Sequence, residues 1–254
     1  MEWILLFVAG VLGGVLNSVA GGGSFLTFPA LLFVGVPSIM ANATNTFAVC
    51  AGYISGTYGF KQDILSKTSN LGAIVFWSML GGGLGAYFLL TINEAIFLES
   101  IPWLLLFATI LFLCGQHINQ FFVDLSANAS IDPLWSKVAL AICLVLVSAY
   151  GGFFNAGLGV VILSYLVLAG YSDINQMNGV KLLVSSCVSI IAIVIFVMDG
   201  AIDWTRGLIV MSGTLVGGYV AARVSRNIEQ RHVKNFVALS SIGMTCYFFW
   251  STYA

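Results

Sequence analysis

The sequence predicts an all-α polytopic membrane protein with two inverted repeats, each a broken or re-entrant helical hairpin followed by three transmembrane helices. The first observation is composition: 59% of the 254 residues are hydrophobic and 7% are charged, against about 25% charged residues in soluble domains. The second is a glycine-rich interruption that occurs twice within apolar sequence. The third is the distribution of loop charges, which reverses between the two halves of the chain.

The hairpins are predicted where short apolar arms flank the two interruptions. The motif AGGGS at 20–24 divides the apolar residues 3–36, and the motif NAGLG at 155–159 divides the apolar residues 136–170. The same interval separates Gly21 from Gly157 and Gly23 from Gly159. Backbone groups without partners cost several kcal/mol each in lipid, so these interruptions are expected inside protein or beside a water-filled cavity. Broken segments at matching positions of two halves indicate a transporter's binding site.

Six longer apolar runs complete the repeats, because a full span takes about 20 residues. They fall at about 40–60, 70–91 and 101–123 in the first half and at about 179–198, 206–222 and 233–253 in the second. We expect a first repeat over 1–114, a connector over 115–135 that the third run overlaps, and a second repeat over 136–254. Three spans and one hairpin cross the membrane an odd number of times, as inversion requires.

A second pair of glycine motifs supports the repeat. Gly81 and Gly85 align with Gly213 and Gly217, at an interval close to the one that separates the two interruptions. Glycines four residues apart let two helix backbones approach closely. These four positions are therefore expected at helix–helix contacts rather than in a ligand site.

Loop charges predict the orientation of each half. Basic residues fall in the loop before one middle span and in the loop after the other: Lys61 and Lys67, then Arg223, Arg226, Arg231 and Lys234. The opposite loops carry acidic residues: Glu94 and Glu99, then Asp199 and Asp203. Cytoplasmic loops are enriched in Lys and Arg, so we expect a multi-pass protein of the bacterial cytoplasmic membrane with both termini external. The first apolar run lacks a cationic leader and is expected to be retained.

The glycine motifs supply the first candidate site. Gly21, Gly22 and Gly23 allow close approach of a ligand to the backbone, and Ser24 opens a helix whose free N–H groups would attract an anion. Asn17 and the Ser24 hydroxyl add side-chain donors. From the second motif we include Asn155, Gly157 and Gly159. The alternative is that the glycines merely allow a tight crossing of two helices.

A second candidate cluster lies at the mouth of a long span in each half. Asn42, Thr44 and Asn45 could surround a polar ligand, or could cap the helix that they open. Asn178 and Lys181 follow Asn42 and Asn45 by the same interval that separates the two interruptions. A lysine near the bilayer centre costs roughly 2.5–3.5 kcal/mol on insertion scales. We expect Lys181 to neutralise a small anion at a central site, with a lysine that snorkels to the interface as the alternative.

Metal and catalytic chemistry find little support in the sequence. The five cysteines lie in apolar runs without a CxxC pair, and the two histidines fall in or near loops. An intramembrane enzyme would need clustered His, Asp, Glu or Cys, or a serine with a base, deep in the spans. We therefore expect no cofactor, no metal and no enzymatic activity. No basic tract suggests nucleic acid, so the expected partners are a small anion and the lipid bilayer.

Several motifs carry a resemblance to a known family. They are Gly10-x-x-Gly13-Gly14 leading into AGGGS, then Pro29-Ala30-Leu31-Leu32, and Ala41-Asn42-Ala43-Thr44-Asn45. With these motifs the chain resembles, over essentially its whole length, the sulfite exporter TauE/SafE family of membrane permeases. The resemblance implies movement of small sulfur-containing anions, such as sulfite, sulfonates or sulfoacetate, and of related carboxylates. In the second half Gly157-Leu158-Gly159 replaces the fuller glycine run, and Asn178-x-x-Lys181 replaces Ala41-x-x-Thr44-Asn45.

The residues and the resemblance together predict a secondary transporter that works by alternating access. The two hairpins would meet near the bilayer midplane, where amides and asparagines hydrogen-bond an oxyanion and Lys181 neutralises it. An anion channel of the same architecture is the alternative, which single-channel currents would distinguish from slow counterflow.

Overall fold

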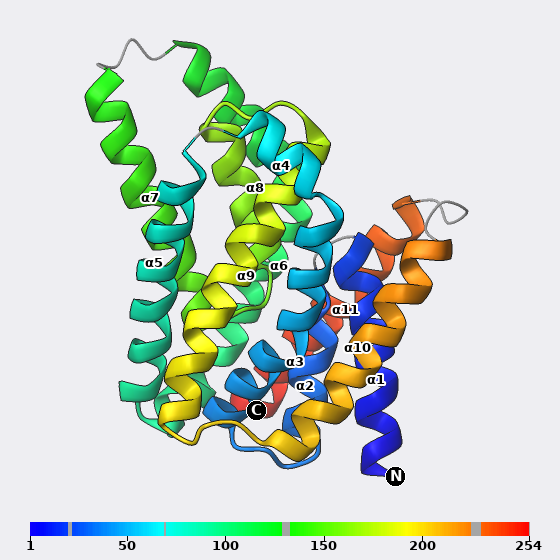
Figure 1. Cartoon of the computed structure of the whole chain (residues 1–254). Coiled ribbons are helices and arrows are strands. Elements are labelled where there is room, and N and C mark those ends of the chain that lie inside the picture. The colour runs from blue at the N-terminus through cyan, green and yellow to red at the C-terminus, as the bar shows by residue number, and fades with distance from the viewer. Residues whose placement is uncertain (20–21, 69, 129–132, 225–229, 254) are drawn as a thin grey trace.

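The computed structural model describes residues 1–19, 22–68, 70–128, 133–224 and 230–253, and these form eleven helices without a strand (Figure 1). The helices are α1 Glu2–Val19, α2 Ser24–Phe33, α3 Ser38–Gly59, α4 Lys61–Lys67, α5 Leu71–Thr91, α6 Glu94–Asn128, α7 Pro133–Phe153, α8 Leu158–Leu168, α9 Ile174–Met198, α10 Trp204–Val224 and α11 Gln230–Tyr253. The predicted all-α class is confirmed.

Membrane-spanning length recurs among these helices. Helices α5 and α9 and the Glu94–Cys114 part of α6 are long and apolar enough to cross a bilayer. Helices α3, α10 and α11 contain 22, 21 and 24 residues and also reach spanning length, with more polar residues among them. The chain is therefore an integral, polytopic membrane protein.

Two segments differ from the sequence prediction. The expected loop at 61–69 contains the short helix α4. Helix α6 runs for 35 residues through Asn128, so the first part of the expected connector, 115–135, continues a helix. The sequence there is polar enough to suggest a loop, but it contains no proline or glycine that would end α6 after Gly115. The repeat boundaries stay predictions.

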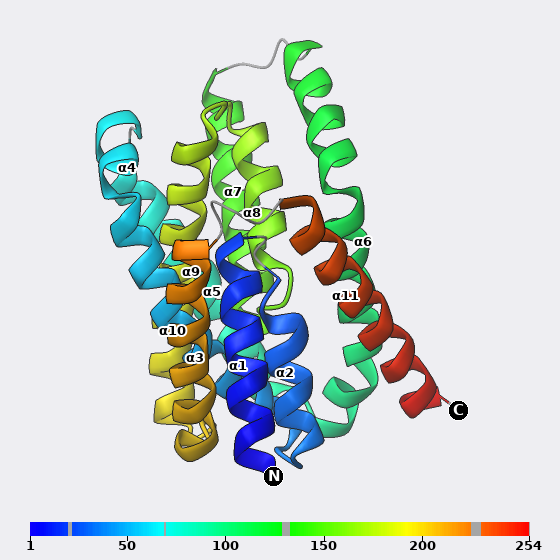
Figure 2. The same cartoon turned by 90° about the vertical axis from the view of Figure 1, so that its right-hand side faces the viewer.

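Both expected hairpins are present. Helices α1 and α2 lie side by side around a break that includes Gly22 and Gly23 (Figure 2). Helices α7 and α8 flank the residues 154–157. Gly157 has a left-handed backbone with φ of +76°, which glycine adopts without strain. The two motifs differ in where the return helix begins: α2 starts directly after Gly23, whereas Gly159 already lies inside α8.

The glycine-lined helix contacts occur twice. Helix α1 packs along α10, and α5 packs along α7. A Cβ on Gly14 would overlap the Thr214 carbonyl oxygen, and in the other helix pair a Cβ on Gly152 would overlap the Gly82 carbonyl oxygen. Two more contacts repeat in the same way: Gly217 on Val11 with Gly85 on Ala149, and Gly213 on Phe7 with Gly81 on Val145. The predicted role of these glycines in close helix packing is confirmed.

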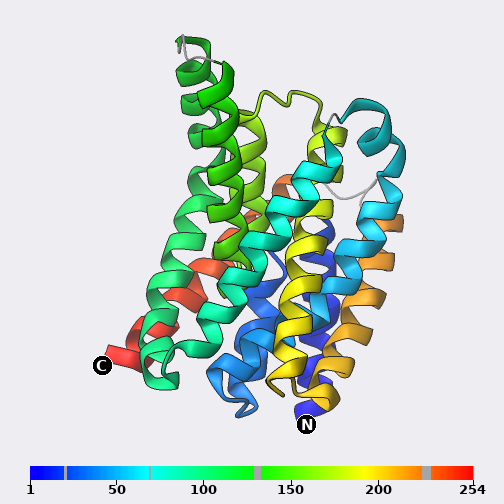
Figure 3. The ribbon, with the colours of Figure 1, turned by 60° about the vertical axis from the view of Figure 1, so that its left-hand side comes forward.

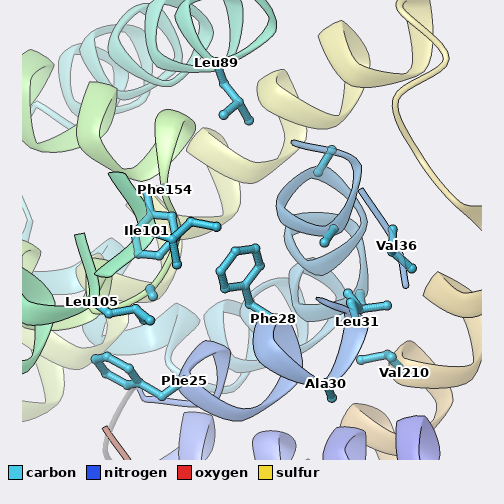
Figure 4. Packing of buried hydrophobic residues seen from close by; sticks show 14 of the residues in the cluster. Phe25, Phe28, Ala30, Leu31, Val36, Leu89, Ile101, Leu105, Phe154 and Val210 are labelled. Carbon is cyan, nitrogen blue, oxygen red and sulfur yellow. The ribbon is translucent and has the colours of Figure 1, made fainter. Parts of the chain in front are cut away.

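The return arm of the first hairpin packs against the break of the second. Phe28 of α2 and Phe154 meet edge to face with ring centroids 5.5 Å apart (Figure 4). Phe28 and Phe154 are both fully buried, as are Ile101 and Leu105 of α6 beside them. Because lipid tails are as apolar as these side chains, van der Waals packing rather than transfer from water holds them together. This packing brings the two hairpins together in the interior.

The central helices complete the frame. Helix α9 packs against both α3 and α5 (Figure 3). The two chain termini lie toward one end of the molecule, opposite α4 (Figures 1 and 2). A common side for both termini fits the predicted topology.

Candidate functional site

A tyrosine in the middle of α3 lies where the two hairpin breaks meet. The Tyr53 hydroxyl donates a hydrogen bond of 2.8 Å to Asn155 Oδ1, in the break between α7 and α8. The side chains of Asn17, in the last turns of α1, and Ser24, at the start of α2, also lie beside this hydroxyl. Tyr53 is 6% exposed and Asn155 is 1% exposed. Three predicted site residues, Asn17, Ser24 and Asn155, are thus brought together around Tyr53.

Asn155 carries a buried donor that no described residue uses. Its Nδ2 has no hydrogen-bond partner among the residues that the structure describes. Buried polar groups are nearly always paired, and an unsatisfied one costs about 1–3 kcal/mol. A polar ligand that accepts a hydrogen bond from this amide would remove that cost. The Asn155 amide is therefore a candidate contact for a polar ligand.

Polar side chains in the first turn of α2 form hydrogen bonds with a side chain of α3. Asn45 Oδ1 accepts a hydrogen bond of 2.5 Å from Thr27 Oγ1, and Asn45 Nδ2 donates one of 3.2 Å to Ser24 Oγ. Ser24, Thr27 and Asn45 are buried. Asn45 therefore joins α3 to the first hairpin, and the predicted neighbourhood of Asn45 and Ser24 is found in the structure.

The backbone at the first break is less open than the sequence suggests. The N–H groups of Phe25, Leu26 and Thr27 donate to the carbonyls of Gly22 and Gly23. The N–H groups of residues 24–27 were expected to be free for an anion. Because the turn into α2 is tight, three of these four groups already donate to backbone carbonyls.

The glycines of both breaks make close helix crossings. A Cβ on Gly23 would overlap the Gly13 carbonyl oxygen of α1, and one on Gly22 would lie 2.5 Å from Val237 of α11. At Gly157 a Cβ would lie 2.8 Å from that of Ala108. The close-crossing alternative accounts for Gly22, Gly23 and Gly157, while Gly21 lies outside the described residues.

Two predicted site residues of α3 lie outside the Tyr53 cluster and make hydrogen bonds that join α3 to other parts of the chain. Asn42 Nδ2 donates a hydrogen bond of 2.8 Å to the Phe153 carbonyl, at the end of α7. Thr44 Oγ1 accepts one of 3.0 Å from the Asp203 N–H, just before α10. Asn42 thus positions the break that carries Asn155, whereas Thr44 joins α3 to the α10 side.

Lys181 lies on α9 and is displaced along the helix axis from the Tyr53 cluster. Its Nζ donates a hydrogen bond of 3.1 Å to Asn178 Oδ1, and the residue is 9% exposed. No carboxylate in the described part of the chain lies within ion-pair distance of this nitrogen. Further along α9, Ser186 Oγ lies 3.1 Å from Thr57 Oγ1, one turn beyond Tyr53 on α3. At 1.5 Å per residue Lys181 is about 7.5 Å along α9 from that contact, toward the α4 end.

Tyr53 was missed by sequence reasoning, whereas Thr27 was expected among the side-chain donors at the first glycine motif. Tyr53 lies in a run of small and apolar residues, where a tyrosine is ordinary, and no repeat partner singles it out. Among the described residues no three His, Cys, Asp or Glu side chains gather as they would around a metal ion. The arrangement offers amide and hydroxyl donors, with one lysine about 13 Å away along the helices toward the α4 end.

Comparison with known proteins places these features in a family. The profile of the family described as Sulfite exporter TauE/SafE matches residues 6–248. A "Probable membrane transporter protein" of Haemophilus influenzae is 25% identical over 246 residues, 95% of this chain and 92% of that one. "Probable membrane transporter protein YfcA" of Escherichia coli K12 is 26% identical over 246 residues, 95% and 87% of the two chains. "Probable membrane transporter protein ORF9" of a Sinorhizobium species is 25% identical over 94% and 89%. No solved structure matches the chain.

Proposed function

Because the chain belongs to the sulfite exporter TauE/SafE family, we propose that it is a secondary transporter of small sulfur-containing or organic anions. Sulfite, sulfonates and sulfoacetate are the proposed substrates, carried across the bacterial cytoplasmic membrane by alternating access. The observation that carries this proposal is the buried Nδ2 of Asn155, which lacks a partner in the described chain and lies where the two hairpins meet.

In the proposed site the groups that contact the anion are uncharged. Asn155 Nδ2 donates to an oxygen of the anion, and the Asn17 amide and the Ser24 hydroxyl complete the shell. The Tyr53 hydroxyl, whose proton bonds Asn155 Oδ1, orients the Asn155 amide. Hydrogen bonds from neutral donors to a charged group contribute about 1.5–3 kcal/mol each. A tetrahedral or pyramidal oxyanion presents several acceptor oxygens, so it can use donors that arrive from α1, α2 and the second break together.

Lys181 supplies the positive charge from a position displaced along α9 toward the α4 end. Along the helices Lys181 is about 13 Å from Tyr53, and at that distance and an effective dielectric constant of about 20, two unit charges attract by roughly 1 kcal/mol. Lys181 therefore stabilises the bound anion without touching it. Because no carboxylate in the described chain pairs with it, its charge is available to the substrate. One lysine and a neutral shell match a substrate that binds with a single negative charge.

Inverted repeats provide the proposed movement. Support comes from the glycine contacts between α1 and α10, which recur between α7 and α5. Thr109 of α6 and Thr245 of α11 are 136 residues apart, and their hydroxyls lie 3.1 Å from each other. The same interval separates Gly21 from Gly157, so these threonines are equivalent, and equivalent residues meet in this way at a two-fold axis. Rocking of one repeat against the other would expose the Tyr53 cluster to each side in turn.

The proposal gives the chain no catalytic role. Its relatives are named as membrane transporter proteins, and the groups at the proposed site are amides and hydroxyls rather than a nucleophile with its base. The end with both termini is assigned to the outside and the α4 end, with Lys61, to the cytoplasm, following the positive-inside rule.

Counterflow in proteoliposomes tests the function. The purified chain is reconstituted into vesicles loaded with unlabelled sulfite, and uptake of trace labelled sulfite is compared with sulfate, sulfoacetate and a simple sulfonate as competitors. We expect saturable exchange that a sulfonate or sulfoacetate inhibits, and no exchange in vesicles without protein. Unitary currents of a channel, or no exchange with any of these anions, would contradict the proposal.

A further inference from the structure

Helix α9 carries a row of buried polar side chains on one face. Lys181, Ser185 and Ser189 follow one another at intervals of four residues, and residues four apart lie on the same face of a helix. All three are buried, although α9 is long and apolar enough to cross a bilayer. Polar and ionisable residues inside a membrane are costly and mark the pathways of substrates or ions. We name Lys181, Ser185 and Ser189 the polar row of α9.

The contacts of α9 place the polar row between α3 and the second hairpin. On one side of the row, Leu182 and Ser186 touch α3. On the other side, Val184 and Val188 pack with apolar residues of α7 and α8. At about 100° per residue, the two serines of the row fall between these two contact surfaces. The hydrogen bond at the centre of the Tyr53 cluster also joins α3 to the second hairpin, so the row borders that cluster.

Ser189 lies at the depth of Tyr53. Helices α3 and α9 are antiparallel, because the end of α3 packs against the first turns of α9. At about 1.5 Å per residue, Tyr53 lies about 6 Å from the contact between Thr57 and Ser186, and Ser189 lies about 4.5 Å from it in the same direction. The two residues are therefore within about 2 Å of one another along the helix axes.

The Ser189 hydroxyl has no partner in the described part of the chain, and the residue is 0% exposed. A serine within a helix often donates to the carbonyl four residues before it, as Ser186 does to Leu182, but Ser189 makes no such bond. Buried polar groups are nearly always paired. Asn155 Nδ2 and Ser189 Oγ are thus two unpaired buried groups, from the second break and from α9, at the depth of the same tyrosine.

Given the transport function proposed above, on which this inference rests, we propose that the polar row is the route of the anion between the Tyr53 cluster and the cytoplasm. Ser189 Oγ donates to the anion beside Asn155, Ser185 Oγ donates to it next, and Lys181 Nζ holds it at the α4 end of the row. Successive members of the row are about 6 Å apart along α9, which two hydrogen bonds of about 2.8 Å to one anion can bridge. The anion therefore contacts one group before it leaves the previous one. All three side chains are buried here, so the row opens to the cytoplasm when the repeats move.

Sulfite counterflow in Ser189→Ala tests the step nearest the site. The variant should exchange sulfite at least tenfold more slowly than the wild type, because the anion loses the donor beside Asn155. Ser148→Ala is the matched control: the Ser148 hydroxyl is equally buried and unpaired in the described chain, but the residue lies against Gly81 in the crossing of α5 and α7. Loss of an unpaired buried hydroxyl should lower the Tm of neither variant. Equal exchange by the two variants, or slow exchange with a lowered Tm in Ser189→Ala, would overturn the proposal.

Thiol labelling of Ser185→Cys tests the route without any transport. The reagent is (2-sulfonatoethyl) methanethiosulfonate, which carries a sulfonate and does not cross membranes. It is added to inverted vesicles, which expose the cytoplasmic face, and to spheroplasts, which expose the outer face. Mass spectrometry of peptides locates the label among the five native cysteines. We expect labelling of Ser185→Cys to be at least tenfold faster in the inverted vesicles, and Ser148→Cys to stay unlabelled in both.

The labelling result separates this proposal from the proposed function. Absent labelling of Ser185→Cys, or labelling that is no faster from the cytoplasmic side, would overturn the route. No sulfite exchange by the wild type would instead contradict the proposed transport of this anion, and the labelling of Ser185→Cys would still decide whether the polar row opens to the cytoplasm.

Discussion

The two hairpin breaks differ in a way that separates packing from binding. At the first break, Gly23 lies against the α1 backbone, and Asn45 satisfies the start of α2. At the second break, Asn155 has one amide atom bonded to Tyr53 and the other without a partner in the described chain. The glycine-rich break is therefore closed by the protein itself, whereas the glycine-poorer one keeps a buried donor that no described residue uses. A glycine motif thus indicates close approach of two helix backbones, and the polar side chain beside it indicates which hydrogen-bonding groups are present.

The largest effect is expected at Asn155. Asn155→Ala removes the free donor and should lower sulfite counterflow roughly a hundredfold, because a buried hydrogen bond to a charged group contributes close to 3 kcal/mol. The rate per folded molecule is measured in proteoliposomes. Asn175→Ala, at an exposed position near the start of α9, is the control and should keep wild-type exchange. Equal exchange by both variants would remove the second break from the site.

Lys181→Ala comes next. Loss of about 1 kcal/mol of attraction should raise the KM for sulfite about fivefold, with the protein still folded in detergent. Lys61→Ala removes an exposed lysine on α4 and serves as the control for net charge. The KM values of the two variants are compared by initial-rate uptake. A wild-type KM in Lys181→Ala would mean that this lysine only faces the membrane interface.

Gly23→Ala is expected to affect stability rather than binding. The added methyl group meets the Gly13 backbone, and overpacking of this kind costs about 1–3 kcal/mol. The Tm in detergent should fall by several degrees, while the KM of the folded fraction stays close to that of the wild type. In Gly72→Ala the methyl group meets open space, so its Tm should not fall. A raised KM with an unchanged Tm would instead place the first break in the substrate site.

Tyr53→Phe should give the smallest effect. The hydroxyl orients the Asn155 amide through one neutral hydrogen bond, so its loss should raise KM about threefold. Tyr58→Phe, further along the same helix and exposed, is the control. Tm measured alongside KM distinguishes a binding role from a packing role, because a purely structural hydroxyl would lower Tm and leave KM unchanged.

The fold could be predicted from sequence because hydropathy and glycine act locally. Apolar runs set the helices, and the pairs Gly81/Gly85 and Gly213/Gly217 predict close helix contacts by their spacing alone. The end of α6 was harder to predict, because polarity alone does not end a helix that lacks Gly or Pro.

The candidate site was less predictable because it depends on which groups satisfy one another. Asn17, Ser24 and Asn155 were predicted as site residues from the sequence. Thr44 was predicted on the same ground, a polar side chain within an apolar run, but it accepts a hydrogen bond from the Asp203 N–H instead. Tyr53 connects the breaks through contacts between residues 102 apart in the chain, and no local pattern encodes such a contact. Lys181 was selected for its rarity in an apolar helix, and its proposed role in binding stays a prediction.

Isothermal titration calorimetry with sulfite on the purified wild type, Asn155→Ala and Asn175→Ala tests the central claim most directly. The account predicts saturable one-to-one binding to the wild type and to Asn175→Ala, and a loss of that binding in folded Asn155→Ala. Equal sulfite affinity in all three proteins would contradict it, because the anion would then bind somewhere other than the Asn155 amide of the second break.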